Sequence, residues 1–295
     1  MLRFSLAAVV FPLAILAQDT APSPQPKPTS VAAATKAPAK PAAPEPEAPA
    51  PVPLATPVPS VPTAPNTPKL TYSQCHVDGP YIAMTFDDGP HPTQTPRLLE
   101  MLKQRGIKAT FYCVGQCVAE YPEIAKRIVE EGHEIANHSW SHPNLIPMSE
   151  SAVRDQLERT HQVIKQATGI EPKTFRPPYG NFTQRQRNWA NATYGYKIIL
   201  WDVDTLDWQH HNPAKTESIA LAQTRAGSIV LQHDIHKTTV DAMPATLDAL
   251  AAKGFKFVTV SELIAMDKPV PPKAKATPVA TGAQAKAQAA SKRGD

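Results

Sequence analysis

Between residues 81 and 260 the chain alternates short apolar, β-branched runs with segments whose apolar residues recur every three to four positions. The short runs predict strands and the recurring pattern predicts helices, because side chains repeat every two residues in a strand and every 3.6 in a helix. Strands that alternate with helices in this way indicate a parallel α/β sheet. The predicted strands are 81–86, 109–115, 134–139, 174–180, 196–203, 228–234 and 256–260.

Chemically active side chains fall where several of these strands end. Asp87 and Asp88 follow the first strand, His138 and His142 the third, and His233 lies in the sixth. In a barrel of parallel strands the carboxyl ends converge on one face, whereas an open doubly wound sheet would spread these residues along an edge. The pattern therefore favours a barrel-like α/β domain that is incomplete relative to eight units.

Proline separates this domain from the rest of the 295 residues. Of the 33 prolines, sixteen lie between residues 21 and 69 and four follow residue 267. Such Pro/Ala-rich segments bury too little apolar surface to offset their ordering entropy, so we expect disorder over 18–69 and 268–295 around a single domain at 70–267.

The first residues have the pattern of an export signal. Arg3 precedes an apolar run that ends at Ala17, so we expect a signal peptide over 1–17. An uncleaved signal anchor is the alternative. In either case the domain is expected to be secreted or extracytoplasmic, in the periplasm or the cell wall.

Charge is distributed unevenly along the chain. The overall net charge is +4, but segment 70–267 carries 19 basic and 22 acidic residues, whereas 268–295 carries six basic residues and one acidic residue. A nucleic-acid enzyme concentrates positive charge on its folded domain, so no nucleic-acid partner is expected. The basic tail could contact an anionic cell-envelope polymer electrostatically, or remain solvated without a partner. Pairing among Cys75, Cys113 and Cys117 stays open.

Two histidines four residues apart suggest a metal site. His138 and His142 at this spacing would lie on one side of a helical turn, and two imidazoles with one carboxylate suit a divalent transition metal with open positions for water and substrate.

Five short motifs extend this interpretation. In their order and spacing, over about residues 81–264, they resemble the polysaccharide deacetylase family, also called NodB-homology or carbohydrate esterase family four. The resemblance implies a distorted (β/α) barrel of about seven parallel strands, which agrees with the strand pattern. The motifs are TFDDGP (85–90), HSWSHP (138–143), RPPYG (176–180), DTLDW (204–208) and LQHD (231–234).

The resemblance implies a set of catalytic groups. Asp87 would be the general base, steadied by Arg176, and His233 the general acid, supported by Asp207. The backbone N–H of Tyr179 would help to form the oxyanion hole. An acetamide needs an activated water, a stabilised oxyanion and a proton for the departing amine, and these groups supply all three.

The resemblance also implies a metal cofactor and a pocket for the acetyl group. Asp88, His138 and His142 would hold a divalent metal, with Zn²⁺ expected first and Co²⁺ or Mn²⁺ as alternatives. Trp208 and Leu231 would line the pocket.

The expected function is a secreted, metal-dependent N-deacetylase that acts on N-acetylglucosamine units of chitin, chito-oligosaccharide or peptidoglycan, with metal-activated water, an aspartate base and a histidine acid. Two alternatives stay open. One is an O-acetyl xylan-type esterase of the same family, and the other is a catalytically silent glycan-binding wall protein.

Overall fold

The computed structural model describes residues 69–269. The predicted signal peptide, nearly all of the predicted Pro/Ala-rich linker and the predicted basic tail beyond Pro269 lie outside the described residues. Within 69–269, no helix combines the length and apolar character needed to cross a membrane. The three cysteines are unpaired in the described domain.

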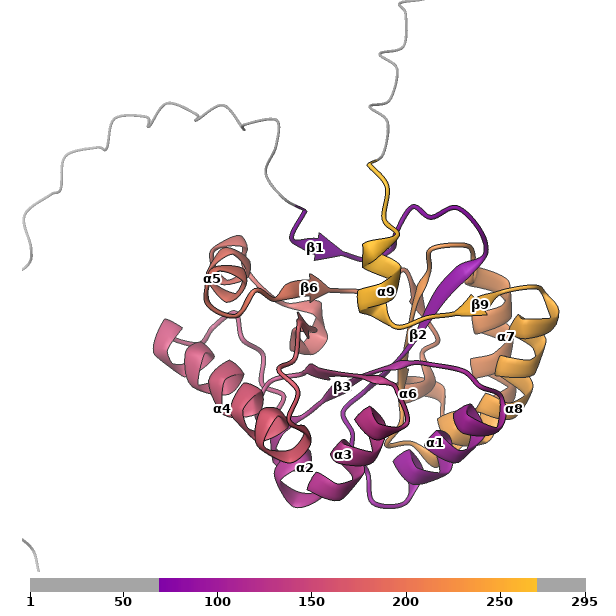
Figure 1. The fold of residues 1–295 in the computed structure, drawn as a ribbon, viewed down its shortest axis with the longest axis horizontal. Helices are drawn as coiled ribbons and strands as arrows, with labels where there is room; N and C mark the ends of the chain where they lie inside the picture. The colour runs from indigo at the N-terminus through magenta and orange to yellow at the C-terminus, as the bar shows by residue number, and fades with distance from the viewer. Residues whose placement is uncertain (1–68, 270–295) are drawn as a thin grey trace, which may run out of the picture. The chain divides into compact units, whose positions relative to one another are not determined.

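In the described part of the chain, nine short strands form one sheet in which all paired strands are parallel (Figure 1). Their order is β1-β6-β5-β4-β3-β2-β8-β7, and β9 pairs with the start of β2. The strands are β1 (Thr71–Tyr72), β2 (Tyr81–Asp87), β3 (Thr110–Cys113), β4 (Glu134–Asn137), β5 (Thr174–Phe175), β6 (Lys197–Ile199), β7 (Val203–Asp204), β8 (Ile229–His233) and β9 (Lys256–Phe257).

Chain connectivity requires this sheet to curl. Strands β6 and β7 are separated only by residues 200–202, a link that spans about 14 Å at most. They are nevertheless six places apart in the strand order, which would be about 29 Å in a flat sheet. An antiparallel bridge between Gln74 and Ser228 also joins the chain after β1 to the start of β8. The expected barrel-like α/β fold is therefore confirmed.

Two predicted strands differ from the structure. The segment 196–203 was predicted as one strand, but it divides into β6 and β7 on different parts of the sheet. The strand predicted over 174–180 ends at Phe175, and a 3₁₀ turn, η1 (Pro178–Gly180), follows. Pro177 and Pro178 explain this ending, since proline has no N–H to donate to a strand ladder. Strand β1 was not predicted.

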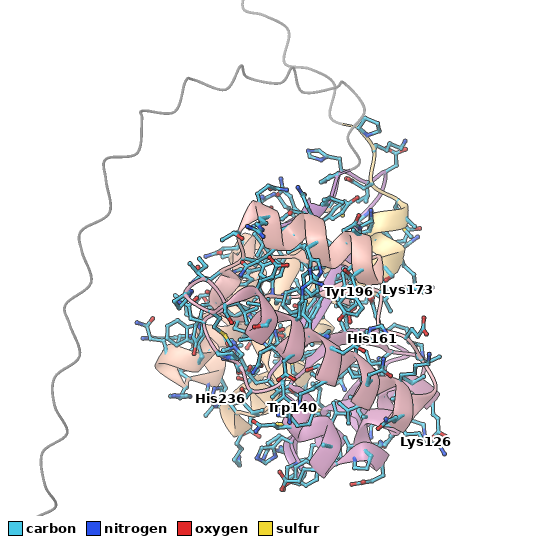
Figure 2. The ribbon with its side chains drawn as sticks, turned by 90° about the vertical axis from the view of Figure 1, so that its left-hand side faces the viewer. Lys126, Trp140, His161, Lys173, Tyr196 and His236 are labelled. Atoms are coloured by element: carbon cyan, nitrogen blue, oxygen red, sulfur yellow. The ribbon has the colours of Figure 1, made fainter. Side chains whose placement is uncertain are left out.

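Helices cover the outer face of the sheet (Figure 1). Helices α7 and α8 pack against each other, and α4 packs against α2 and α3. On α4, the Nδ1 atom of His161 lies 2.8 Å from the Tyr196 hydroxyl (Figure 2). The helices are α1 (Gln94–Gln104), α2 (Gly115–Glu120), α3 (Pro122–Glu130), α4 (Glu150–Thr168), α5 (Gln184–Tyr194), α6 (Asp207–His210), α7 (Pro213–Gln223), α8 (Lys237–Ala252) and α9 (Val260–Ala265).

Along each strand, alternate side chains point to the two faces of the sheet, so one set packs in the hydrophobic core and the other faces the barrel interior and the site. On β2, Ile82, Met84 and Phe86 pack in the core that the helices cover. The intervening residues face the barrel interior, because successive side chains in a strand point to opposite faces. Thr85 and Asp87 therefore lie on the inner face, and both are buried.

Helix α9 closes the amino-terminal end of the barrel. Val260 and Leu263 pack in the inner core cluster, and the Glu134 carboxylate accepts hydrogen bonds from the backbone N–H and the hydroxyl of Ser261. Glu134 is the first residue of β4, so its contact with α9 lies at the amino-terminal ends of the strands. Helix α9 therefore fills that end of the barrel. The carboxyl ends of the strands remain for a site.

Candidate active site

A cavity of about 380 Å³ opens at the carboxyl ends of the strands. Asp87 and His233 are the last residues of β2 and β8, and His138 follows the last residue of β4. Parallel strands thus bring together residues that lie far apart in the sequence. The cavity is lined by Asp87, Asp88, His138, His142, Pro177, Tyr179, Trp201, Asp204, Trp208, Leu231 and His233.

Asp88, His138 and His142 form a possible metal site. One ligand atom from each lies within 4.8 Å of the others. The Nε2 atoms of His138 and His142 are 3.4 Å and 3.5 Å from Oδ1 of Asp88. That carboxylate oxygen is buried without a hydrogen-bond partner, which is costly unless a cation or proton faces it. The donor set, two imidazoles and one carboxylate, fits a divalent transition metal.

Hydrogen bonds and charge prepare these groups for a cation. Nδ1–H of His138 donates to the backbone carbonyl of Arg176 at 2.7 Å, which leaves Nε2 unprotonated toward the site in the neutral ring. Burial alone would raise the pKa of Asp88, but the nearby imidazoles of His138, His142 and His233 hold that pKa well below its ordinary value. Burial lowers the pKa of His142.

The two histidines do not lie on a helical turn, so that expectation was wrong. Residues 138–142 form an irregular loop in which Ser139 and His142 have φ angles of 67° and 56°. The loop leaves β4 and crosses the barrel end, and these two left-handed residues turn both imidazoles toward Asp88. The four-residue spacing correctly indicated that the two imidazoles lie in one cluster, but it did not indicate the backbone conformation between them.

Asp87 is held on the inner face by Arg176. The guanidinium of Arg176 donates from one nitrogen to Oδ1 of Asp87 at 2.7 Å and to Oγ1 of Thr85 at 2.8 Å. Arg176 is fully buried and its guanidinium lies 4.2 Å from the ring centre of Tyr112. Oδ2 of Asp87, 3.5 Å from Nε2 of His138, is the oxygen left to accept a proton.

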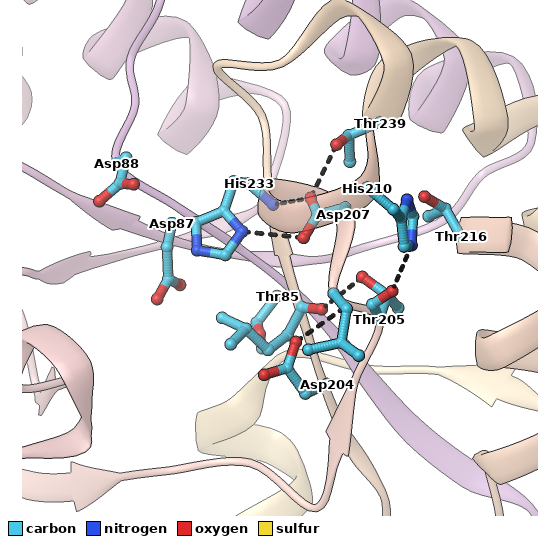
Figure 3. Close-up of polar contacts among 12 residues, drawn as sticks. Thr85, Asp87, Asp88, Asp204, Thr205, Asp207, His210, Thr216, His233 and Thr239 are labelled. Atoms are coloured by element: carbon cyan, nitrogen blue, oxygen red, sulfur yellow. Dashed lines mark hydrogen bonds and ion pairs between the residues drawn. The ribbon is translucent and has the colours of Figure 1, made fainter. Parts of the chain in front are cut away.

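His233 is held by Asp207. Nδ1–H of His233 donates to Oδ1 of Asp207 at 2.9 Å, and Oδ2 of Asp207 accepts from the His233 backbone N–H and from Thr239 (Figure 3). Burial opposes the imidazolium, but the hydrogen bond and charge of Asp207, with Asp87 and Asp88 further off, raise the pKa of His233 to about 9. His233 is therefore protonated at neutral pH, with Nε2–H available to the cavity.

The candidate base and acid come from paired strand positions. Asp87 and His233 are register partners on the neighbouring strands β2 and β8. Both lie on inner-face positions and line the same cavity. A proton acceptor and a proton donor thus face one space, which is the arrangement that acid–base hydrolysis requires.

The remaining predicted residues also line the cavity. Leu231 is buried, whereas Trp208 is 48% exposed and Tyr179 is 64% exposed at the rim. Tyr179 has a φ angle of 59°, and its ring centre lies 4.7 Å from that of His142. A left-handed non-glycine residue at a cavity rim is a conformation that the surrounding structure must enforce.

Sequence reasoning missed several supporting residues. Thr85 links Arg176 to the β8 backbone by donating to the carbonyl of Val230 at 2.6 Å, and its position two before Asp87 on the same strand face was the available signal. Thr239 on α8 and Trp201 after β6 gave no comparable signal. Asp204, the first residue of the DTLDW motif, lines the cavity and accepts a hydrogen bond from the Leu206 N–H at 2.9 Å.

The barrel-like fold and the opposed carboxylate and imidazole define a parallel α/β protein with a hydrolase-type acid–base site. A family model described as Polysaccharide deacetylase matches residues 76–199. Together with a relative 38% identical over most of its length, described next, this match shows that the chain belongs to the polysaccharide deacetylase family.

Curated relatives carry deacetylase names. The chain is 40% identical over 206 residues to peptidoglycan-N-acetylglucosamine deacetylase PgdA of Listeria monocytogenes, covering 70% of this chain and 42% of that protein. It is 38% identical to a peptidoglycan-N-acetylglucosamine deacetylase of Bacillus cereus, covering 64% and 72%. It is 34% identical to a chitooligosaccharide deacetylase of Bradyrhizobium, covering 62% and 90%. The chain thus spans less than half of the Listeria protein.

Solved structures agree with the fold. A peptidoglycan N-acetylglucosamine deacetylase in complex with a hydroxamate-type benzamide superposes with a TM-score of 0.65 at 34% identity, covering 68% of this chain and 96% of that one. A pseudoenzyme of the CE4 family from Bacillus anthracis superposes with a TM-score of 0.64 at 31% identity, covering 67% and 70%. One member of the CE4 family is thus described as a pseudoenzyme, so activity has to be argued from this chain's own site.

Proposed function

We propose that this chain is a metal-dependent deacetylase that hydrolyses the N-acetyl group of N-acetylglucosamine units in a cell-wall glycan, with peptidoglycan as the first substrate to test. The observation that carries the proposal is the placement of Asp87 and His233 as register partners across one cavity beside the cluster of Asp88, His138 and His142. The names of the relatives support the substrate class. We propose that the domain acts outside the cytoplasm, where a cell-wall glycan is found.

Asp87 acts as the general base. Arg176 occupies Oδ1 and fixes the carboxylate plane, so Oδ2 is positioned to take a proton from an attacking water. Because Arg176 is itself fully buried and stacked near Tyr112, the base cannot swing away from the cavity.

The cluster of Asp88, His138 and His142 would hold the metal. When bound there, a divalent cation would supply Lewis acidity toward the acetyl carbonyl and an attacking water. We expect Zn²⁺, with Co²⁺ or Mn²⁺ as alternatives, because all three accept this donor set. The backbone N–H of Tyr179, at the same rim, would donate to the oxygen that becomes negative during attack.

His233 acts as the general acid. Its Nδ1–H is committed to Asp207, so the proton on Nε2 faces the cavity and is available to the departing amine. Leu231 and Trp208 would enclose the acetyl methyl group, because they supply the apolar walls on the β8 and α6 side. An amine is a poor leaving group, so this proton transfer is essential to amide cleavage.

The test is acetate release by the full chain from peptidoglycan, chitin oligomers and acetylated xylan, measured before chelation, after chelation and after Zn²⁺ is returned. The variant Asp87→Asn removes the base, and Asp248→Asn on the exposed face of α8 is its control for the same substitution elsewhere. We expect metal-dependent release from an N-acetylated glycan that D87N abolishes and D248N retains.

Other outcomes would select the alternatives. Release from xylan alone would make the chain an O-acetyl esterase. If the chain releases acetate from both kinds of substrate, His233→Ala should reduce amide cleavage far more than ester cleavage, since an alkoxide leaves with less acid help. Metal binding without release from any of the three glycans would support the catalytically silent glycan-binding protein; one solved neighbour is described as a pseudoenzyme.

A further inference from the structure

The peptide between the two histidines of the metal cluster needs support from outside. Residues 138–142 form neither helix nor strand, and Ser139 and His142 adopt left-handed φ angles. Non-glycine residues keep this conformation only when surrounding contacts enforce it. The positions of both imidazoles therefore depend on whatever binds this loop.

Gln156 on α4 binds the middle of the loop. Its Oε1 accepts hydrogen bonds from the backbone N–H groups of Trp140 at 2.9 Å and Ser141 at 3.0 Å. Its Nε2 donates to the Ser141 hydroxyl at 3.2 Å. Two N–H donors can only be satisfied by the carbonyl end of the amide, so the orientation of Gln156 is determined by the contacts themselves.

The other N–H groups of the loop are satisfied by local side chains. Oδ1 of Asn137 accepts from the N–H of Ser139 at 2.8 Å, and Oγ of Ser139 accepts from the N–H of His142 at 3.1 Å. Four successive N–H groups thus bond to side chains. Gln156 is the acceptor that comes from a distant element, so it is the one that ties the loop to the helical layer.

Backbone hydrogen bonds from α2 hold the opposite side of the loop. The N–H groups of Gly115 and Gln116, at the start of α2, donate to the carbonyls of Ser139 and Trp140 at 2.9 Å and 3.0 Å. The loop therefore lies between α2 and α4; Figure 2 labels Trp140 in the loop and His161 on α4. With α2 on one side, the hydrogen bonds to Gln156 tie the loop backbone to α4 on the other, and the Arg159 guanidinium on α4 lies 3.9 Å from the Trp140 ring centre.

We propose that Gln156 is a positioning residue for the metal cluster, which acts by fixing the peptide between His138 and His142. Gln156 is buried and does not line the cavity, so its effect on a metal is indirect. The inference rests on the metal site of the proposed function, but not on the reaction. Loss of such a supporting contact weakens metal binding by about 10- to 100-fold in proteins generally.

The experiment measures Zn²⁺ affinity of the full chain by competition with a chromophoric chelator. Gln156→Leu removes both acceptor bonds, and Gln156→Asn withdraws the carbonyl by one methylene while it keeps the site polar, in case the leucine variant does not fold. Gln156→Glu retains an oxygen that accepts from both N–H groups. Gln162→Leu makes the same change on the exposed face of α4.

We expect Q156L and Q156N to weaken Zn²⁺ binding by about 10- to 100-fold, with Q156E and Q162L close to wild type. Urea unfolding of the metal-free variants separates positioning from general stability, because Q156N should bind Zn²⁺ more weakly even where its metal-free stability equals that of Q156E. Equal affinity of Q156N and wild type would overturn the inference, as would equal losses in Q156E and Q156N. A wild-type chain that binds none of Zn²⁺, Co²⁺ and Mn²⁺ would overturn the metal site as well.

Discussion

Replacing Asp207 with asparagine should convert His233 from a cation into a neutral ring at neutral pH. Asparagine is isosteric and its oxygen can still accept the bond from Nδ1 of His233, but it carries no charge. His233 is mostly buried, and burial opposes its charged form. Asp207 is therefore the main reason that the imidazolium persists.

The structure gives the size of this effect. The pKa of His233 is raised from 6.5 to about 9 despite burial, a rise of about 2.5 that corresponds to roughly 3 kcal/mol. Without the Asp207 charge, burial dominates, and only the more distant carboxylates of Asp87 and Asp88 still favour the cation. We expect the pKa of His233 in D207N to fall by at least about 2.5, to 6.5 or below.

The assay is NMR titration of the His233 imidazole in metal-free wild type and D207N. If His233 donates the proton to the amine, kcat/KM falls as pH rises through its pKa, so the basic limb of the activity profile should move to lower pH in D207N. Thr239→Val, which removes only the neutral donor to Asp207, is the control and should change the pKa little. If the pKa of His233 in D207N differed from the wild-type pKa by less than 1, Asp207 could not be the residue that keeps His233 charged.

Three further predictions concern the buried framework. Arg176→Met leaves the buried Asp87 carboxylate unpaired and should cost about 3–5 kcal/mol of unfolding free energy in urea; a loss below about 1 kcal/mol would contradict a buried pair. Gly115→Ala places a Cβ 2.6 Å from the Trp140 ring, so we expect a loss of about 1–3 kcal/mol in urea and weaker Zn²⁺ binding, and unchanged Zn²⁺ affinity would contradict the close packing. Burial lowers the pKa of His133 to about 4, so between pH 6.5 and 4 the unfolded state binds a proton that the folded state does not. The free energy of unfolding should therefore fall as pH drops from 6.5 toward 4. His133→Asn should reduce this loss when urea unfolding is compared at pH 7 and pH 4.5.

Much of the site could be predicted because its information is local. Each motif gives residue types at fixed spacing, and the apolar runs before them show which residues end a strand. Asp87 and His233 close the runs that became β2 and β8, and parallel strands bring such ends to one face. Period-two alternation then places both side chains inside the barrel. Residue order therefore determined the fold class and the residues that meet.

Backbone conformation between motifs was decided by tertiary contacts. The run 196–203 has uniform strand character, yet it divides because closure of the sheet requires β6 and β7 to pair with different neighbours. Local propensity does not contain that requirement. The left-handed residues Ser139 and His142 likewise arise from bonds to other elements, so the spacing of the histidines suggested a helical turn that does not exist.

The supporting residues show the same division. Gln156 and Thr239 are ordinary polar residues on helices, and in the sequence they stand 15 residues or more from the groups they hold. Hydrogen-bond partners of this kind are selected by the packing of α4 and α8 on the sheet, since a polar side chain becomes specific only when burial leaves it one set of partners. The sequence by itself determined which groups carry the chemistry, and the tertiary structure decided which groups hold them in place.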